Sequence, residues 1–230
     1  MSERVLYLHG FSGKPDGVKY QALHNARPQF NLHPPLQLPF PDRLPEGLLQ
    51  KTMVVLSVWS RLRKALEVAQ RAVDSFHPDV IVGSSMGGAL ATQLKSSAAL
   101  VLIAPATRIS WLPVGFGPYP DVPVPPATIL IHSPNDRLVP LEASRALLRR
   151  SQPTNPGGVA TVHRVGAGLT AMGFSPEDHR LLVLGATHSC NDPDPGSKGL
   201  SQDHPHVALV ESTHLLSGRM GNLGRFRSAA

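Results

Sequence analysis

The chain has 230 residues, of which 41% are hydrophobic, and it carries a net charge of +6. This hydrophobic content with both signs of charge argues against a disordered chain, and no apolar run approaches the roughly 20 residues that cross a bilayer. The basic residues are scattered, with no aromatic ladder between them on which bases would stack. We therefore expect a soluble domain with no nucleic-acid or membrane partner.

The sequence contains few residues that would indicate a disulfide or a metal site. The single cysteine, Cys190, has no partner for an internal disulfide, and the apolar run at residues 5–8 is too short for a secretory signal. Both features favour a cytoplasmic protein, whose oligomeric state the sequence does not indicate. We predict no metal and no cofactor, because compact zinc spacing is absent from the one polar cluster, Cys190, Asp192, Asp194, His204 and His206.

Apolar runs alternate with helix-forming segments along most of the chain. In chain order, the patterns predict a strand at 4–9, a helix at 17–25, a short strand around 36–38, a helix at 58–76, a strand at 79–83, a helix at 86–95, and strands at 99–104 and 127–132. A helix at 141–149, a β-like run at 159–165, a strand at 180–184 and a helix at 206–216 follow. This alternation predicts an α/β fold with a mostly parallel sheet and helices on both faces.

The predicted elements form one domain over residues 1–216. Two stretches interrupt it: the proline-rich segment 105–126, which we interpret as a short cover over the site, and an insertion at 151–178 whose structure the sequence does not reveal. Trp111, Phe116 and Tyr119 in the cover are candidates to line a pocket. Residues 217–230 are expected to form a mobile tail.

The strongest chemical signal is a Gly-x-Ser-x-Gly pentad centred on Ser85, between a β-branched run and a helix-forming segment. A serine on a sharp strand-to-helix turn adopts a strained backbone, and Gly83 and Gly87 remove the side chains that would collide there. The turn also directs the first N–H groups of the helix toward the group that Ser85 attacks. We interpret Ser85 as a nucleophile.

A serine nucleophile needs a base, and the base needs an orienting acid. In an open parallel sheet, these groups lie beyond the carboxyl ends of the strands. Asp136 follows the strand at 127–132 and His188 follows the strand at 180–184, which gives the order Ser, Asp, His. His179 is the alternative base, although it precedes that last strand. His9 is better placed to shape an oxyanion pocket, and His132, at the end of a strand, is interpreted as structural.

These motifs together resemble the α/β-hydrolase fold superfamily, in particular its small bacterial esterase-like members without a full cap domain. The resemblance is carried by His9-Gly10-Phe11, the pentad around Ser85, Asp136 followed by Val139-Pro140, and Gly185-x-x-His188. It implies that Ser85 is the nucleophile, His188 the base and Asp136 the acid. It also implies an oxyanion hole formed by the backbone N–H groups of Phe11 and Met86.

The function expected from these residues is hydrolysis of a small-molecule carboxylic ester through an acyl-enzyme on Ser85. A thioesterase or an acyltransferase would use the same parts. A catalytically inactive binding module of the same fold is a further alternative, in which Ser85 is retained only for the turn.

The assignment of the base leads to a first prediction. His188→Ala should abolish turnover of an ester substrate, whereas His179→Ala should retain most of it, because only His188 follows the last predicted strand. Steady-state rates of the two purified variants check this. The reverse ranking would make His179 the base.

Overall fold

The computed structural model of the protein describes residues 2–11, 13–25, 30–40, 48–108, 128–132, 136, 138–150, 162–164 and 180–183. The elements within this part are β1 (Glu3–Leu8), α1 (Val18–Asn25), β2 (Phe30–Leu32), α2 (Leu48–Phe76), β3 (Val80–Ser84), α3 (Met86–Ala91), β4 (Ala99–Ile103), β5 (Thr128–His132), α4 (Leu141–Arg150), β6 (Val162–Arg164) and β7 (Arg180–Val183).

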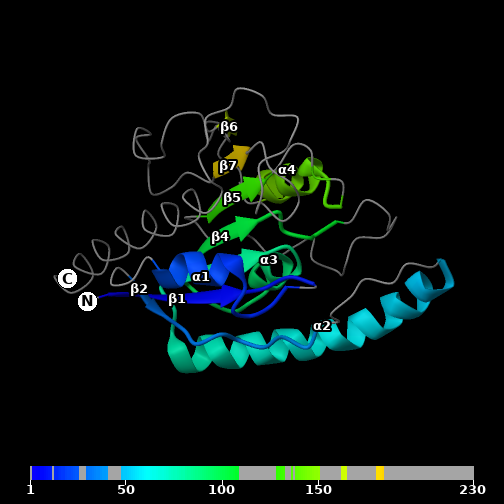
Figure 1. The fold of residues 1–230 in the computed structure, drawn as a ribbon. Coiled ribbons are helices and arrows are strands. Elements are labelled where there is room, and N and C mark those ends of the chain that lie inside the picture. Colours follow the sequence, from blue (N-terminus) through cyan, green and yellow to red (C-terminus); the bar gives the residue numbers. More distant parts are fainter. Residues whose placement is uncertain are drawn as a thin grey trace.

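The described strands form one sheet in the order β2-β1-β3-β4-β5-β7-β6, and every neighbouring pair is parallel. Figure 1 shows the strand arrows pointing in a common direction, so that the carboxyl ends of the strands share one edge of the sheet. The predicted α/β fold with a parallel sheet is confirmed. The loops that carry the predicted chemistry follow β1, β3, β5 and β7, and so leave the sheet at the same edge.

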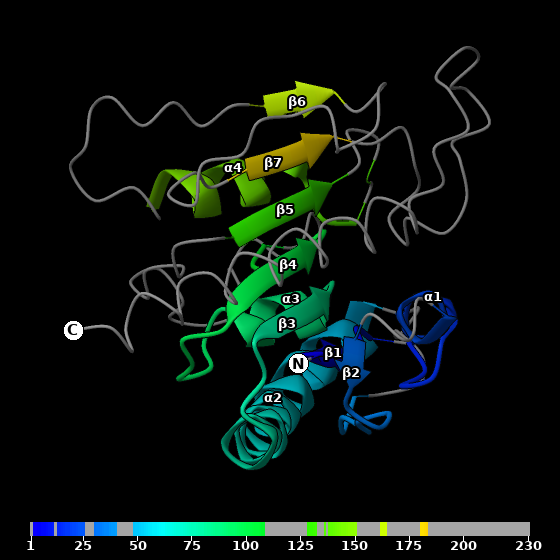
Figure 2. The same cartoon turned by 90° about the vertical axis from the view of Figure 1, so that its left-hand side faces the viewer.

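Helices lie on both faces of the sheet, as predicted. Figure 2 shows α1 on one face, and α3 and α4 on the other. The long helix α2 contacts β1 and α3, and in Figure 1 it runs past the carboxyl ends of the strands. Right-handed crossovers explain why helices lie on both faces. The chain moves from β1 outward to β2 and then reverses direction toward β3, β4 and β5, so helices before and after the reversal fall on opposite faces.

The core consists of two layers of apolar side chains separated by the sheet. Tyr7, Val82, Val101 and Ile129 are register partners on β1, β3, β4 and β5, and all four are buried on the face that α1 covers. One residue further along each strand, the side chains point to the opposite face. There Leu8, Leu102 and Leu130 join the larger core cluster under α2, α3 and α4, beside Gly83.

Two sequence predictions in the first third of the chain were wrong. The short strand lies at Phe30–Leu32 rather than around 36–38, because prolines at 34, 35 and 39 flank the predicted stretch and remove donors that a strand needs. α2 begins at Leu48, ten residues before the predicted start at 58. Residues 48–58 are mostly apolar without a 3.6-residue period, so the pattern that reveals an amphipathic helix is missing there.

The remaining elements lie close to the predicted positions. α3 ends at Ala91 and is followed by turns, so it is shorter than the predicted helix at 86–95. β6 lies within the insertion at 151–178 and pairs with β7, which adds a strand to the edge of the sheet. The rest of that insertion, residues 109–126 of the cover, the predicted helix at 206–216 and the tail at 217–230 lie outside the described residues. In the described part, no helix is both long and apolar enough to cross a membrane.

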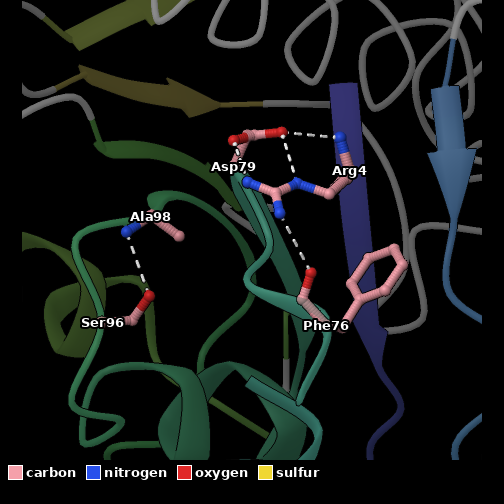
Figure 3. A network of polar contacts seen from close by, with 5 residues as sticks. All are labelled: Arg4, Phe76, Asp79, Ser96 and Ala98. Atoms are coloured by element: carbon pink, nitrogen blue, oxygen red, sulfur yellow. Dashed lines mark hydrogen bonds and ion pairs between the residues drawn. The ribbon is translucent and has the colours of Figure 1, made fainter. Parts of the chain in front are cut away.

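The amino edge of the sheet is fastened by an ion pair between Arg4 and Asp79, at the starts of β1 and β3 (Figure 3). Asp79 Oδ2 accepts from the backbone N–H of Arg4 at 2.8 Å and from Nε at 3.3 Å, and Oδ1 accepts from Nη2 at 3.1 Å. Nη1 of Arg4 also donates to the carbonyl of Phe76, at the end of α2. One guanidinium thus ties β1, β3 and the carboxyl end of α2 together.

This network predicts a pH-dependent contribution to stability. Partial burial raises the pKa of Asp79, but the hydrogen bonds and the charge of Arg4 outweigh it and hold that pKa below its ordinary value of 3.8. A lowered folded-state pKa stabilises the fold above pH 3.8, and this contribution is lost as the pH falls toward the folded-state value. Asp79→Asn should therefore lower the free energy of unfolding by about 1 kcal/mol at pH 7, since the pair is partly exposed.

Urea unfolding at several pH values measures this effect. Asp74→Asn is the control, because Asp74 is an exposed carboxylate near the end of α2 whose side chain accepts from the neutral amide of Gln70 rather than from a cation. The stability difference between wild type and Asp79→Asn should shrink below pH 4, while the control should stay near wild type at pH 7. A difference that is constant down to pH 2 would contradict the assignment.

Candidate active site

Ser85 stands at the tip of the turn between β3 and α3, in a backbone conformation that L-residues rarely adopt. Its φ is 52° and its ψ is −115°, which for a non-glycine residue costs on the order of 1–3 kcal/mol. Three backbone hydrogen bonds hold it there. Its N–H donates to Ile103 O at 2.8 Å, and its carbonyl accepts from Ala89 at 3.0 Å and from Ala106 at 2.9 Å. Its side chain makes no capping hydrogen bond to α3.

The glycines of the pentad are required by close backbone approach. A Cβ on Gly83 would lie 2.7 Å from the Gly87 carbonyl oxygen, and a Cβ on Gly87 would collide with the carbonyl oxygen of Leu8. A Cβ on Gly88 would be tight but not forbidden, at 3.0 Å from the Gly83 carbonyl oxygen and 3.1 Å from Pro105. Because real Cβ atoms do not approach backbone as closely as they would at Gly83 and Gly87, these two positions accept only glycine, and the turn packs directly on the ends of β1 and β4.

The loop after β1 lies against the turn at Ser85. A Cβ on Gly10 would lie 2.8 Å from Ser85 Cβ and 3.4 Å from the backbone nitrogen of Met86. Phe11 is the next residue along this loop, and Met86 is the first residue of α3, so its N–H has no acceptor within the helix. The two backbone N–H groups that the sequence suggests for an oxyanion hole therefore belong to segments that meet beside Ser85.

The side chain of His9 holds this loop through hydrogen bonds at both ring nitrogens. The imidazole is buried and its Nε2 accepts the N–H of Leu38 at 3.2 Å, so the ring proton lies on Nδ1, which donates to Gly10 O at 2.9 Å. Burial lowers the pKa of His9, although the Gly10 carbonyl raises it in part. The ring is thus held neutral, and its edge-on contact with Phe40 and the contact of Phe40 with Phe11 complete an apolar wall.

A second buried polar contact lies directly before Ser85. Tyr7 on β1 hydrogen-bonds to the side chain of Ser84, the last residue of β3. Burial raises the pKa of Tyr7 far above its ordinary value, and the Ser84 contact offsets only part of that rise. The phenol is therefore a neutral hydrogen-bonding group at any physiological pH, and it ties β1 to the residue next to Ser85.

Asp136 lies beyond the carboxyl end of β5, where its side chain is fully buried. Oδ1 accepts two backbone N–H groups, from Leu138 and Val139, both at 2.9 Å. Oδ2 lies 3.6 Å from Nε2 of His132, the last residue of β5. Because β4 alone separates β3 from β5, Asp136 and Ser85 follow strands roughly 10 Å apart on the same edge.

The structure therefore brings Ser85, Met86, Phe11 and Asp136 to one edge of the sheet. His188, the alternative base His179 and the candidate pocket residues Trp111, Phe116 and Tyr119 lie outside the described residues, as does the polar cluster around Cys190. Within the described residues, no group of three His, Cys, Asp or Glu side chains is arranged to hold a metal ion.

Two features of the site could not be read from the sequence. Ala104 at the end of β4 has a φ of 42°, although nothing marks alanine for such a conformation. Ser144 on α4 is fully buried and hydrogen-bonds to His132, but it lies 12 residues away in the chain. Only the hydrophobic periodicity of α4, which places position 144 beside the buried Ala143 and Leu147, gave a hint.

Solved structures with similar folds are hydrolases and lipolytic enzymes. A protein of the alpha/beta hydrolase superfamily from Xanthomonas campestris pv. campestris is 23% identical, with a TM-score of 0.52 over 95% of this chain and 99% of that one. One of the metagenome-derived lipolytic enzymes LipS and LipT is 20% identical, with a TM-score of 0.56 over 94% of each chain. The monoacylglycerol lipase of Paleococcus ferrophilus is 13% identical, with a TM-score of 0.51 over 92% and 94%.

No protein-family model and no curated protein matches the chain. The likeness to the solved structures accordingly concerns the fold.

The strained backbone at Ser85 generates a stability prediction. Ser85→Gly should have a free energy of unfolding about 1 kcal/mol higher than Ser85→Ala, because glycine adopts a positive φ without the steric cost that alanine retains. Denaturant unfolding of both variants measures the difference. The matched pair is Ser84→Gly and Ser84→Ala, where φ is not positive and glycine should be the less stable variant. The same order at both positions would contradict strain at Ser85.

Proposed function

Because the chain has the α/β-hydrolase fold, we propose that it is a serine hydrolase that cleaves small carboxylic esters. The observation that carries the proposal is the strained turn at Ser85, held by three backbone hydrogen bonds and by glycines packed against β1 and β4. Strained backbone conformations cluster at functional sites, and nucleophilic attack is the chemistry that a serine on such a strand-to-helix turn serves.

In the proposed mechanism, Ser85 Oγ attacks the ester carbonyl while the base removes its proton. The negative charge that develops on the carbonyl oxygen is stabilised by the backbone N–H groups of Phe11 and Met86. The protonated base gives its proton to the departing alcohol, which leaves an acyl group on Ser85. Water, deprotonated by the same base, then attacks this acyl-enzyme and releases the carboxylic acid, and Asp136 keeps the base in the required orientation.

The register of β7 supports His188 as the base. β7 begins at Arg180, the partner of Ile129 near the start of β5, and ends at Val183, the partner of His132 at the end of β5. The chain therefore enters β7 at the amino edge of the sheet and leaves it, after Val183, at the edge that holds Ser85 and Asp136. A base that follows β7 in the sequence is favoured over one that precedes it. The four residues of β7 separate these edges by roughly 13 Å.

The ester substrate class is supported by two further observations. The half-buried Phe11 and the buried Phe40 have ring centroids 5.1 Å apart and form an apolar wall beside the loop after β1. Such a wall suits an uncharged acyl group. Two of the similar structures are lipolytic, one of them a monoacylglycerol lipase. Thioester cleavage and acyl transfer to another alcohol use the same groups, and comparing oxygen esters with thioesters would rank these activities.

Labelling with a fluorophosphonate tests the nucleophile. The wild type should be labelled and should hydrolyse p-nitrophenyl esters of short chain length, whereas Ser85→Ala should do neither, because only an activated serine attacks phosphorus at a useful rate. Labelled protein detected by intact mass, together with initial rates of nitrophenol release, provides the measurement.

Ser96→Ala is the control, because Ser96 lies at the amino edge of the sheet and bonds to the backbone of Ala98 (Figure 3). It should be labelled as fast as the wild type. A folded wild type that is neither labelled nor active would favour the binding-module alternative.

A further inference from the structure

The last residue of β5, His132, is a fully buried histidine that the proposed reaction does not use. Its Nδ1 lies 2.7 Å from Ser144 Oγ on α4, and its Nε2 lies 3.0 Å from the carbonyl oxygen of Val139. Both ring nitrogens are therefore held inside the protein. His132 cannot act as a base toward Ser85, since neither nitrogen is presented to a substrate.

The two contacts of His132 determine where its proton lies. A carbonyl oxygen only accepts, so Nε2 carries the hydrogen that is donated to Val139. In the neutral ring, Nδ1 then accepts the hydroxyl hydrogen of Ser144. The Ser144 hydroxyl thus fixes both the tautomer and the orientation of the imidazole, and it does so from α4, the helix that packs beside β5.

The same network ends on the carboxylate of Asp136. Val139 accepts from His132 through its carbonyl and donates to Asp136 Oδ1 through its N–H, at 2.9 Å. In addition, the Nε2 nitrogen of His132, which carries this hydrogen, lies 3.6 Å from Asp136 Oδ2. The side chains of both residues have 0% exposure, so the attraction between this N–H and the carboxylate is weakly screened.

Packing alone does not account for a histidine at this position. Leu130, two residues earlier on the same face of β5, fills the core with an apolar side chain. A buried imidazole and hydroxyl cost free energy unless both are hydrogen-bonded. The imidazole and the hydroxyl are bonded to each other, and the imidazole is also bonded to the carbonyl of Val139, whose N–H donates to Asp136.

We propose that His132 and Ser144 are positioning residues that hold the Asp136 carboxylate in place for the triad. The inference rests on the proposed function for the role of Asp136. Ser144 fixes the ring of His132, and His132 fixes residue 139 and faces Oδ2. Asp136 then meets the base in a single orientation instead of several.

Ser144→Ala tests this proposal, with Ser144→Thr as the conservative variant that keeps the hydroxyl. Ser144→Ala should lower kcat for a p-nitrophenyl ester about tenfold per folded molecule, with KM within a factor of two, because the acid orients the base and does not touch the ester. Ser144→Thr should restore kcat to within threefold of wild type. Thr92→Ala, which removes another buried hydroxyl at the end of α3, is the matched control and should leave kcat unchanged.

A second measurement does not depend on activity. The backbone amide resonances of Leu138 and Val139 report the two hydrogen bonds to Asp136 Oδ1. They should shift in Ser144→Ala and return toward wild type in Ser144→Thr, while Thr92→Ala leaves them in place.

These experiments distinguish failure of the proposed hydrolase function from failure of the positioning role. A wild type that is neither labelled nor active overturns the hydrolase function, and the amide resonances alone then test whether Ser144 positions Asp136. In an active enzyme, a wild-type kcat in Ser144→Ala overturns the positioning role, as does an equal loss in Thr92→Ala. Unshifted amides in Ser144→Ala overturn it whether or not the protein is active.

Discussion

The turn at Ser85 depends on backbone segments that pack closer than side chains would allow. Gly83 and Gly87 bring α3 against β3 and the end of β1 at distances that a Cβ would forbid, and Gly88 lies close to Pro105. This contact forces Ser85 into a positive φ and keeps it there, since the surrounding strands cannot move apart without breaking the sheet. The loops that carry Phe11 and Ala106 are positioned by the same contact. The geometry at Ser85 is thus a property of three strands and a helix together.

Around this turn, two buried imidazoles hold loops rather than strands. His9 binds the carbonyl of Gly10 and the N–H of Leu38, and His132 binds the carbonyl of Val139 and the hydroxyl of Ser144. Both imidazoles stand at the carboxyl end of a strand and use both nitrogens. A rigid ring with a donor on one side and an acceptor on the other can fix an irregular backbone segment that no sheet ladder reaches.

The sequence predicted the order of the sheet-forming segments well, because strands buried on both faces are nearly continuous apolar runs. β1, β3, β4 and β5 lie within a residue or two of the predicted ranges. It failed where a short strand or a helix has no such pattern, at β2 and at the first turns of α2. Ser85 and Asp136 could be chosen from motifs and chain order. The hydroxyl of Ser144 could not be chosen in this way, because its contact with His132 depends on how α4 packs against β5 in the tertiary structure.

The pair formed by Arg4 and Asp79 has a consequence for how the molecule can change. It joins β1, β3 and α2 at the amino edge, a full strand length from the loops that surround Ser85. These contacts therefore lie away from the loops at the carboxyl edge. Substitutions in those loops leave the contacts of Arg4 and Asp79 intact, so the loops can vary while the start of the sheet stays joined.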